Sequence, residues 1–440
     1  MREIDSNAKL DAKTLFDLVK LSFGVVAGAG ALVALVVAYR RQRVDEVGAH
    51  REATRLHTER FSQAVDKLGS DSPAVRLGGV HALAGLADDA PDESLRQTCI
   101  DVLCAYLRLP FPPDPGHPPD GTSTEEQREA HHDKKDRYRA LREVRHTILR
   151  LIGDHYRIPQ GTHRSWQGCN LDLTGVTIDG DMHFNGATFS GGRVSFGGAS
   201  FSGGSVNFGG ATFSGSEVDF TGATFSSGTV AFGGATFSSG TVDFTSATFP
   251  DGTVYFGDAS FSGGRVSFGG ATFSGALVYF GGGTFSGGEV DFICATFSGG
   301  EVDFICATFS GGAVAFGGVS FSDGAVAFGG VSFSGGTVTF AHATFSGGRV
   351  SFASASFSGG RVTFGRATYS GGATFSGGTV DFGGASFSGD TVAFAGASFS
   401  GSTVDFSSAT GRAPRGLLAA VGNPVPATVA LRSDWLPPTP

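Results

Sequence analysis

Lysine is absent from residues 165–410 of this 440-residue chain. That segment has 5 Arg and 16 Asp or Glu, whereas residues 1–164 have 24 basic and 24 acidic side chains. The formal net charge of −9 therefore lies almost wholly in the later segment. Phenylalanine divides the chain at the same place, because 37 of the 41 Phe follow residue 165. Two parts of different composition are indicated.

Cysteine and histidine are also scarce. The five cysteines are an odd number with no C-x-x-C pair, which tells against a disulfide framework and a zinc cage and favours a reducing compartment. They are Cys99, Cys104, Cys169, Cys294 and Cys306. Within 165–410 the histidines are His183 and His342, each isolated in the sequence.

Candidate chemistry is correspondingly thin. Catalysis needs a nucleophile with a base, paired carboxylates or a metal cluster, and no G-K-[ST] phosphate loop is present. His131-His132 beside Asp133 is interpreted as a solvated pair, and the aspartates of the V-D-F triplets are interpreted as solvated surface; these are Asp219, Asp243, Asp291, Asp303, Asp381 and Asp405. We predict no enzyme and no catalytic, cofactor-binding or metal residue.

One long uncharged run lies near the N-terminus. Residues 21–39 hold no charge over 19 positions, and at about 1.5 Å each they span about 28 Å of a hydrocarbon core of roughly 30 Å. A cleaved signal or a buried core helix is the rival interpretation, but Arg40, Arg41 and Arg43 follow at once without a clear A-x-A site. We predict a tail over 1–20 and a single transmembrane helix over 21–39.

The charges that flank this run predict its orientation. Four Lys or Arg precede it and six follow within about 20 residues, which places the C-terminal part in the cytoplasm. Gly24 and Gly28 form a G-x-x-x-G that would allow a homodimer, although small residues are also ordinary in membrane helices.

Helical periodicity continues after the run. Apolar spacing over 40–109, broken at 69–73 and 88–91, predicts a small helical region of three helices. Residues 110–124, with six Pro and two Gly, are predicted to be a linker. An amphipathic helix is predicted over 125–157, with its apolar stripe covering the open end of the following domain and its basic face, interspersed with acidic residues, in solvent. No nucleic-acid partner is expected.

The C-terminal half consists of a 12-residue unit repeated in tandem. ATFSGGRVSFGG begins at Ala187, and related units continue to Phe406. Alternation in each triplet sends Ala, Phe, Val and Phe inward and Thr and Ser outward, while the Gly-rich pieces form corners. The repeats predict a β-solenoid over 165–410.

These units resemble the pentapeptide-repeat family. Ala187-Thr188-Phe189-Ser190-Gly191 and Val194-Ser195-Phe196-Gly197-Gly198 fit its unit, with two residues inserted between them, and Leu171-Asp172-Leu173-Thr174-Gly175 is plainer text of the same kind. Upstream, Val75-Arg76-Leu77-Gly78-Gly79 and Cys104-Ala105-Tyr106-Leu107-Arg108 resemble the region before the repeats in actinobacterial membrane proteins of this family. The resemblance implies a right-handed quadrilateral β-helix with one pentapeptide per face.

Two coil lengths are open. Two repeats would make a 24-residue coil, and about ten coils at about 4.8 Å each would give a rod of roughly 45–50 Å. A 12-residue coil would crowd two Phe into one small turn and would stack Cys294 on Cys306. We prefer the longer coil. At Tyr369 one half-repeat is missing, where we expect a local change of face register. The proline-rich segment 411–440 is predicted to be a disordered tail, although Leu417, Leu418 and Val421 could fold over the last coil.

The sequence therefore describes an α + β-solenoid chain whose function we take to be that of a membrane-anchored scaffold for an unidentified protein partner. Some pentapeptide-repeat proteins imitate DNA and bind gyrase, but here 11 excess negative charges over 246 residues are far sparser than the charge of duplex DNA. A flat hydroxyl array of the ice-binding type is a third hypothesis, although Thr also simply suits strands.

Overall fold

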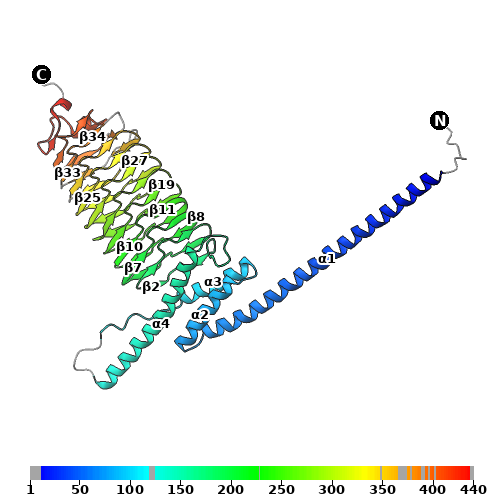
Figure 1. The fold of residues 1–440 in the computed structure, drawn as a ribbon. Coiled ribbons are helices and arrows are strands. Elements are labelled where there is room, and N and C mark those ends of the chain that lie inside the picture. Colours follow the sequence, from blue (N-terminus) through cyan, green and yellow to red (C-terminus); the bar gives the residue numbers. More distant parts are fainter. Residues whose placement is uncertain are drawn as a thin grey trace. The chain divides into compact units, whose positions relative to one another are not determined.

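The structure is a computed structural model that describes residues 11–117, 124–226, 228–346, 349–364, 374–376, 379–387, 392–394, 397–400 and 403–436. Two compact units divide the chain, Met1–Ser62 and Gln63–Pro440. Figure 1 shows the order of the elements along the chain.

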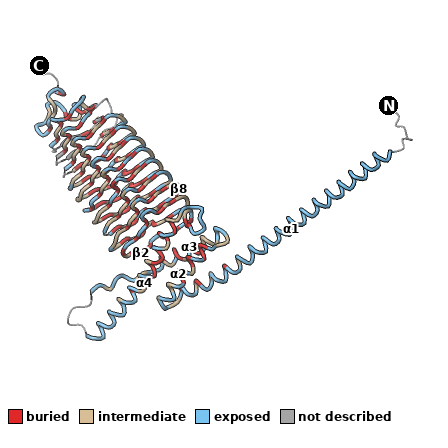
Figure 2. Tube along the Cα trace, viewed as in Figure 1, coloured by how far each residue is buried: buried red, intermediate tan, exposed pale blue. Residues whose placement is uncertain are grey.

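The first unit is helical. Helix α1, Ala12–Leu68, contains a stretch long and apolar enough to cross a membrane, and none of that stretch is buried. Figure 2 shows the same exposure along its whole apolar part. A soluble helix with this composition would bury one face, so the exposed apolar surface is what a bilayer would cover.

Three further helices open the second unit. They are α2 (Pro73–Asp88), α3 (Glu93–Arg108) and α4 (Glu125–Arg157). Each begins where the sequence provides a start: Pro73 in the first turn of α2, the Asp92 side chain accepting from the Leu95 N–H, and a capping box between Thr124 and Gln127. The linker ahead of α4 thus ends at a strong helix start.

The rest of the second unit is a parallel β-solenoid with four ladders of short strands, one to each side of the coil (Figure 1). Ladders 1 and 2 are joined into one sheet by β8 and β11, which turn the corner between them. Ladder 1 comprises β4 (Thr188–Phe189), β8 (Thr212–Asp219), β11 (Thr236–Asp243), β14 (Ser260–Phe261), β18 (Thr284–Phe285), β22 (Thr308–Phe309), β26 (Ser332–Phe333), β30 (Ser356–Phe357), β34 (Ser386–Phe387) and β38 (Thr410–Gly411). Ladder 2 comprises β1 (Leu171–Asp172), β5 (Arg193–Ser195), the second halves of β8 and β11, β15 (Arg265–Ser267), β19 (Glu289–Asp291), β23 (Ala313–Ala315), β27 (Thr337–Thr339), β31 (Arg361–Thr363) and β35 (Val392–Ala393).

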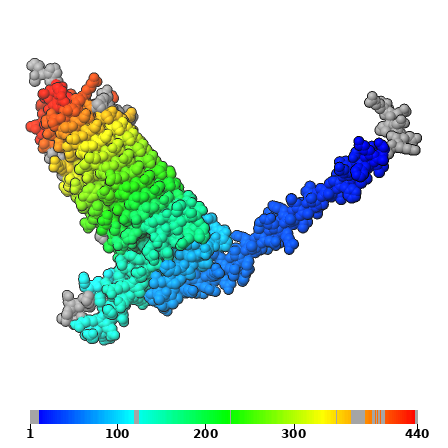
Figure 3. Space-filling view, in the orientation of Figure 1, coloured from blue at the N-terminus to red at the C-terminus, as the bar shows by residue number. Residues whose placement is uncertain are grey.

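The other two sides are separate sheets. Ladder 3 comprises β2 (Thr177–Asp179), β6 (Ser200–Ser202), β9 (Thr224–Phe225), β12 (Thr248–Phe249), β16 (Thr272–Ser274), β20 (Thr296–Ser298), β24 (Ser320–Ser322), β28 (Thr344–Ser346), β32 (Thr374–Ser376) and β36 (Ser398–Ser400). Ladder 4 comprises β3 (Met182–His183), β7 (Gly204–Asn207), β10 (Gly228–Ala231), β13 (Thr253–Tyr255), β17 (Leu277–Tyr279), β21 (Glu301–Asp303), β25 (Ala325–Ala327), β29 (Arg349–Ser351), β33 (Thr379–Asp381), β37 (Thr403–Asp405) and β39 (Val429–Ala430). In the space-filling view the coils form one continuous surface (Figure 3).

Phenylalanine fills the interior. Each Phe lies over the equivalent Phe of the next coil, as in Phe232 and Phe256, whose ring centroids are 4.7 Å apart and whose planes differ by 3°. Phe from facing sides meet edge to face, as in Phe232 and Phe244, 5.7 Å apart at 90°. Aromatic pairs favour both offset-stacked and edge-to-face arrangements. The core is therefore a set of aromatic columns, flanked by the buried Ala and Val of each triplet.

The corners are tight turns. In the turn Phe196 to Ala199, the Ala199 N–H donates to the Phe196 carbonyl (2.9 Å) and Gly198 has φ +63°. This is the pattern of a type II turn, whose third residue needs positive φ. Six equivalent corners place another residue there at φ of 57–60°: Ser246, Asp258, Cys294, Cys306, His342 and Ser354.

The 24-residue coil is confirmed, since Thr224 and Thr248, two units apart in the sequence, are neighbours on ladder 3. In the same way Phe213 pairs with Phe237, and Phe237 with Phe261. Cys294 and Cys306 therefore occupy different corners, the first between β19 and β20 and the second between β21 and β22. A 12-residue coil, which would have stacked them, is excluded because the described units ahead of Tyr369 pair with the second unit after them, as in Thr272 with Thr296.

The irregularity at Tyr369 lies outside the described residues. The strands on either side of it keep their ladders, because Phe345 pairs with Phe375 and Val350 with Val380. The expected change of face register is therefore wrong. Phe345 and Phe375 are 30 positions apart, so this coil has six residues more than the 24-residue coils before it, and the ladders on either side stay in register.

The C-terminal segment corrects a second expectation. Residues 411–436, predicted to lie in a disordered tail, fold back over the last coil through α5 (Leu417–Val421), β39 and the short 3₁₀ helix Ser433–Trp435. Val429 pairs with Val404 on ladder 4, and the Trp435 indole donates to the Gly411 carbonyl (3.1 Å) while packing 5.9 Å from the Phe406 ring. The alternative, that Leu417, Leu418 and Val421 fold over the last coil, is confirmed for Leu417 and Val421, which are buried, whereas Leu418 is exposed.

A disulfide experiment checks the register. A Cβ on Gly318, one coil above Cys294 at the same corner, would lie 3.4 Å from the Cys294 Sγ. We expect Gly318→Cys, in a Cys306→Ala background, to form an intrachain disulfide with Cys294 on mild oxidation, as shown by peptide mapping without reduction. The wild-type chain is the control, in which an intrachain Cys294–Cys306 disulfide would contradict the 24-residue coil.

Candidate functional site

The first coil of the solenoid is closed by side chains of α3 and α4. Without a preceding coil its carbonyl groups would lack partners, and arginines of α4 supply donors. Arg145 donates to the Thr177 carbonyl (2.7 Å), Arg142 to the Asp179 carbonyl (3.2 Å) and Arg157 to the His183 carbonyl (2.9 Å). The expectation that the basic face of this helix is simply solvated is thus wrong for Arg142 and Arg145.

Close packing supports the same junction. A Cβ on Gly153 would lie 2.5 Å from the His183 carbonyl oxygen, so only Gly lets α4 approach β3 so closely. The Tyr156 hydroxyl donates to the Cys169 carbonyl (3.0 Å), and its ring packs 5.1 Å from Phe189. Burial lowers the pKa of Arg145 to about 10, so it remains a charged donor at neutral pH.

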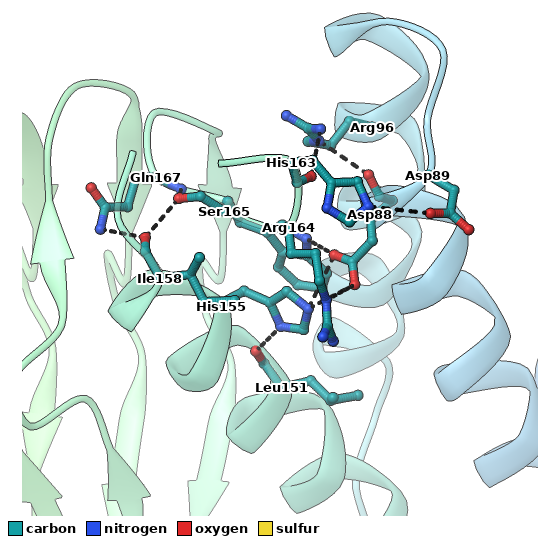
Figure 4. Close-up of polar contacts among 12 residues, drawn as sticks. Asp88, Asp89, Arg96, Leu151, His155, Ile158, His163, Arg164, Ser165 and Gln167 are labelled. Atoms are coloured by element: carbon teal, nitrogen blue, oxygen red, sulfur yellow. Dashed lines mark hydrogen bonds and ion pairs between the residues drawn. The ribbon is translucent and has the colours of Figure 1, made fainter. Parts of the chain in front are cut away.

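A polar cluster surrounds the buried carboxylate of Asp88 next to this junction (Figure 4). The Asp88 carboxylate, at the end of α2, contacts the His155 Nε2 (3.1 Å), the Trp166 Nε1 (3.1 Å) and the Arg164 Nε (3.1 Å). The His155 Nδ1 lies 2.6 Å from the Leu151 carbonyl, and its ring stacks on Trp166 at 4.1 Å. The cluster ties α2, α4 and the loop before β1 together.

Its chemistry is that of a structural clamp. Burial raises the pKa of Asp88, but hydrogen bonds and charge from His155, followed by hydrogen bonds from Arg164 and Trp166, more than offset this, so the pKa is lowered. Both nitrogens of His155 face oxygen atoms, so neither is open to act as a base on a substrate. The sequence gives little indication of this cluster. Asp88 stands in the helix-breaking segment D-D-A-P, and Trp166, one of two tryptophans, is the one rare residue among its members.

The aspartates of the V-D-F triplets are corner supports. Asp219 accepts from the Thr221 N–H (2.9 Å), Asp291 from the Ile293 N–H (2.7 Å) and Asp303 from the Ile305 N–H (2.5 Å). This is the Asx-turn arrangement, which stabilises a tight turn. Their interpretation as freely solvated surface is therefore incomplete, since Asp291 is buried beside Arg265.

The histidines singled out in the sequence are not brought together. His183 lies in β3 at the first coil, whereas His342 lies at a corner many coils away. His132 pairs with Asp136 (3.3 Å) on the exposed part of α4. Among the described residues, no group of three or more His, Cys, Asp or Glu is placed to hold a metal ion.

The outward hydroxyls are brought into rows. On ladder 3, Thr224, Thr248, Thr272 and Thr296 follow one another in register, and the Thr248 hydroxyl donates to Thr224 (3.1 Å). This pair is half-buried and bonded within the row, which reduces what its hydroxyls offer to a ligand.

Comparison with protein-family models, with curated proteins and with solved structures found no match to this chain.

The contacts of Asp88 with His155, Trp166 and Arg164 predict an effect of its substitution on stability. We expect Asp88→Asn to lower the free energy of unfolding by about 3 kcal/mol, because it leaves buried donors facing a neutral amide. Asp89→Asn is the matched control: Asp89 is exposed and meets only His163 at 3.5 Å, so little change is expected. Denaturant unfolding followed by tryptophan fluorescence measures both.

The stabilisation by the Asp88 carboxylate should also depend on pH. Because the pKa of folded Asp88 is below its ordinary 3.8, the stabilisation is complete above that value and is lost as the pH falls through the lowered pKa. The difference between wild type and Asp88→Asn should therefore be smaller at about pH 3 than at pH 7. An equal difference at both would show that the carboxylate charge is not what stabilises the clamp.

Proposed function

We propose that this protein is a non-enzymatic, membrane-anchored scaffold that presents the sides of its β-solenoid to a partner protein. The observation that carries this is the closure of both solenoid ends by the chain itself, by α3 and α4 at the first coil and by residues 411–436 at the last. Capped ends leave the four sides as the exposed surface, and lateral binding is the common use of solenoids.

The apolar stretch of α1 supports the anchor. It is long enough to span a bilayer, and basic residues follow it directly at Arg40, Arg41 and Arg43. We place the solenoid on the cytoplasmic side. Gly24 and Gly28 are exposed on this helix, and because a G-x-x-x-G lets two helix backbones approach closely, we propose that a second copy of the helix can pack there.

The finer family assignment belongs to the same proposal. Four ladders, one to a side, support a quadrilateral helix, and the A-x-F-S-G units supply the sequence resemblance; the 24-residue coil follows from the two residues inserted in each unit. We assign the chain to membrane pentapeptide-repeat proteins of actinobacterial type.

The two other hypotheses receive less support. A DNA mimic needs free negative charge, but Asp219 and Asp291 accept hydrogen bonds from corner N–H groups and lie near Arg193 and Arg265, 3.5 and 3.4 Å away. An ice-binding hydroxyl array would have no role in the cytoplasm.

Natural cysteines test the orientation. Cys294 and Cys306 are exposed, whereas the other three are buried and burial raises their pKa, to about 11 for Cys99 and Cys169 and about 12 for Cys104. We expect a membrane-impermeant maleimide to label the chain only after cells are permeabilised. Cys294→Ala/Cys306→Ala is the control that should abolish labelling, and labelling of intact cells would reverse the topology.

The scaffold role is tested by proximity labelling. We expect a labelling enzyme fused after residue 440 to enrich a reproducible set of proteins over the same enzyme fused to residues 1–62, which retain the apolar helix without the solenoid. If the two fusions label the same proteins, the solenoid recruits nothing and the proposal fails.

A further inference from the structure

Large apolar side chains interrupt an otherwise small and polar outer surface on ladder 4. Tyr255 is 40% exposed, Leu277 37% and Ile305 43%, and Tyr279 is half-buried beside them. At other outward positions of the described ladder 4 strands from β7 onward, the residues are small, polar or charged. We call these four residues the ladder 4 patch.

The register brings the patch together. Tyr255 pairs with Tyr279, and Thr253 with Leu277, so the two strands β13 and β17 are adjacent. The ring centroids of the tyrosines are 6.3 Å apart. Ile305 stands at the corner of the next coil, where its carbonyl accepts from the Gly282 N–H (2.9 Å). Four departures from the repeat thus fall on three consecutive coils of one side.

The side chain of Tyr255, on the first strand of the ladder 4 patch, is held in place by its neighbours. A Cβ on Gly233 or Gly257 would lie 2.5 Å from the Tyr255 ring, so the ring lies against two corner glycines. A side chain fixed before binding loses little entropy on binding, and tyrosines are frequent anchors of protein interfaces.

The charges around the patch are acidic. Glu301 and Asp303 pair directly with Leu277 and Tyr279 on the next strand, and Asp251 and Asp258 flank β13 and are exposed. In the same three coils Arg265 is on ladder 2, in contact with Asp291. Ladder 4 has its own arginine, Arg349, two strands beyond Glu301. A partner that matches this surface carries positive charge around an apolar side chain.

The way of binding is restricted by the sheet. The patch strands are hydrogen-bonded on both sides, β13 between β10 and β17, so no strand can be added here. Three coils extend about 10 Å at about 4.8 Å per strand spacing, which suits one turn of a helix or a few extended residues rather than a whole domain face.

We propose that the ladder 4 patch is the docking site for an arginine-containing amphipathic segment of the partner protein. Apolar side chains of the segment pack on Leu277 and Tyr279 and, at the corner of the next coil, on Ile305, while its guanidinium groups meet Glu301 and Asp303 and the faces of the tyrosines. This proposal rests on the scaffold function proposed above, and it specifies that the partner segment is basic and amphipathic.

The repeat supplies variants that preserve the fold. Tyr255→Ala, Leu277→Thr, Tyr279→Ala and Ile305→Gly each introduce the residue found at the same position in another coil, as in Ala231, Thr253, Ala327 and Gly281. Combined, they form the restored variant. Glu301→Ala/Asp303→Ala, the rim variant, likewise copies Ala325 and Ala327; it removes both acidic side chains and the hydrogen bond that Asp303 accepts from the Ile305 N–H, for which Ala327 has no equivalent. Ile293→Gly is the matched control, because Ile293 is the equally exposed copy at another corner.

The experiment is selection of a random 12-residue phage-displayed peptide library on the full chain in lipid nanodiscs, with the restored variant as counter-target. We expect enriched peptides to combine several Arg with Leu, Ile or Phe. Synthetic peptides should bind the wild type and the Ile293→Gly control equally, and bind the restored and rim variants at least about tenfold more weakly. Added salt should weaken binding, with less effect on the rim variant.

Three outcomes would overturn the docking site. Equal binding to the restored variant would move the interface elsewhere on the solenoid and leave the scaffold function standing. Enrichment of neutral or acidic peptides, or of none, would refute the assigned partner chemistry, while proximity labelling judges the scaffold role independently. Self-association of the wild type that the restored variant lacks would identify a second copy of this chain as the occupant.

Discussion

The aromatic columns set the register on which the rest of the solenoid depends. Each Phe rests on its equivalent in the next coil, and a slip by one residue would turn the Phe of that coil outward and its Thr or Ser inward. Stacking therefore keeps the ladders aligned even where the chain length varies, since across the one lengthened coil the rings of Phe352 and Phe382 still stack at 4.9 Å. Loops and corners can change while the interior remains the same.

A solenoid built this way has two open ends, and each needs its own solution. At the first coil, charged side chains on a long helix reach unpaired carbonyls, and the Asp88 cluster fixes that helix against α2. At the last coil, the chain adds a strand, β39, and covers the terminal Phe406 with Trp435. The first coil is preceded by helices, so long arginine side chains donate to its carbonyl groups. The last coil is followed by an extended segment, so a strand pairs with it and an aromatic side chain covers its last Phe.

Much of this architecture could be predicted from the sequence, because a strict period reports on packing directly. The 12-residue unit, its inward Phe and its glycine corners indicated the coil length, and the uncharged run over residues 21–39 indicated the apolar helix. The caps were harder to foresee. Arg142 and Arg145 read as one more charged helix face, and Trp435 sits among prolines, since contacts made only once leave no period to detect. The corner role of the V-D-F aspartates was missed for a different reason, as an Asx turn is visible only once the turn beside it is known.

The same regularity makes exceptions informative. Where identical units stack, packing in the interior restricts which residues can replace the inward Ala, Val and Phe, whereas the outward positions are not restricted in this way. Most outward positions of the repeat accordingly carry small or polar residues. Duplication explains why Ile293 and Ile305 are both present, because residues 289–300 and 301–312 are identical. It does not explain Tyr255, Leu277 and Tyr279, which differ from the copies around them and lie on one side. Tyr255 and Tyr279 stand where other coils carry Ala231 and Ala327, so the fold does not require a tyrosine there, and a ring already held against two glycines is suited to receive a partner.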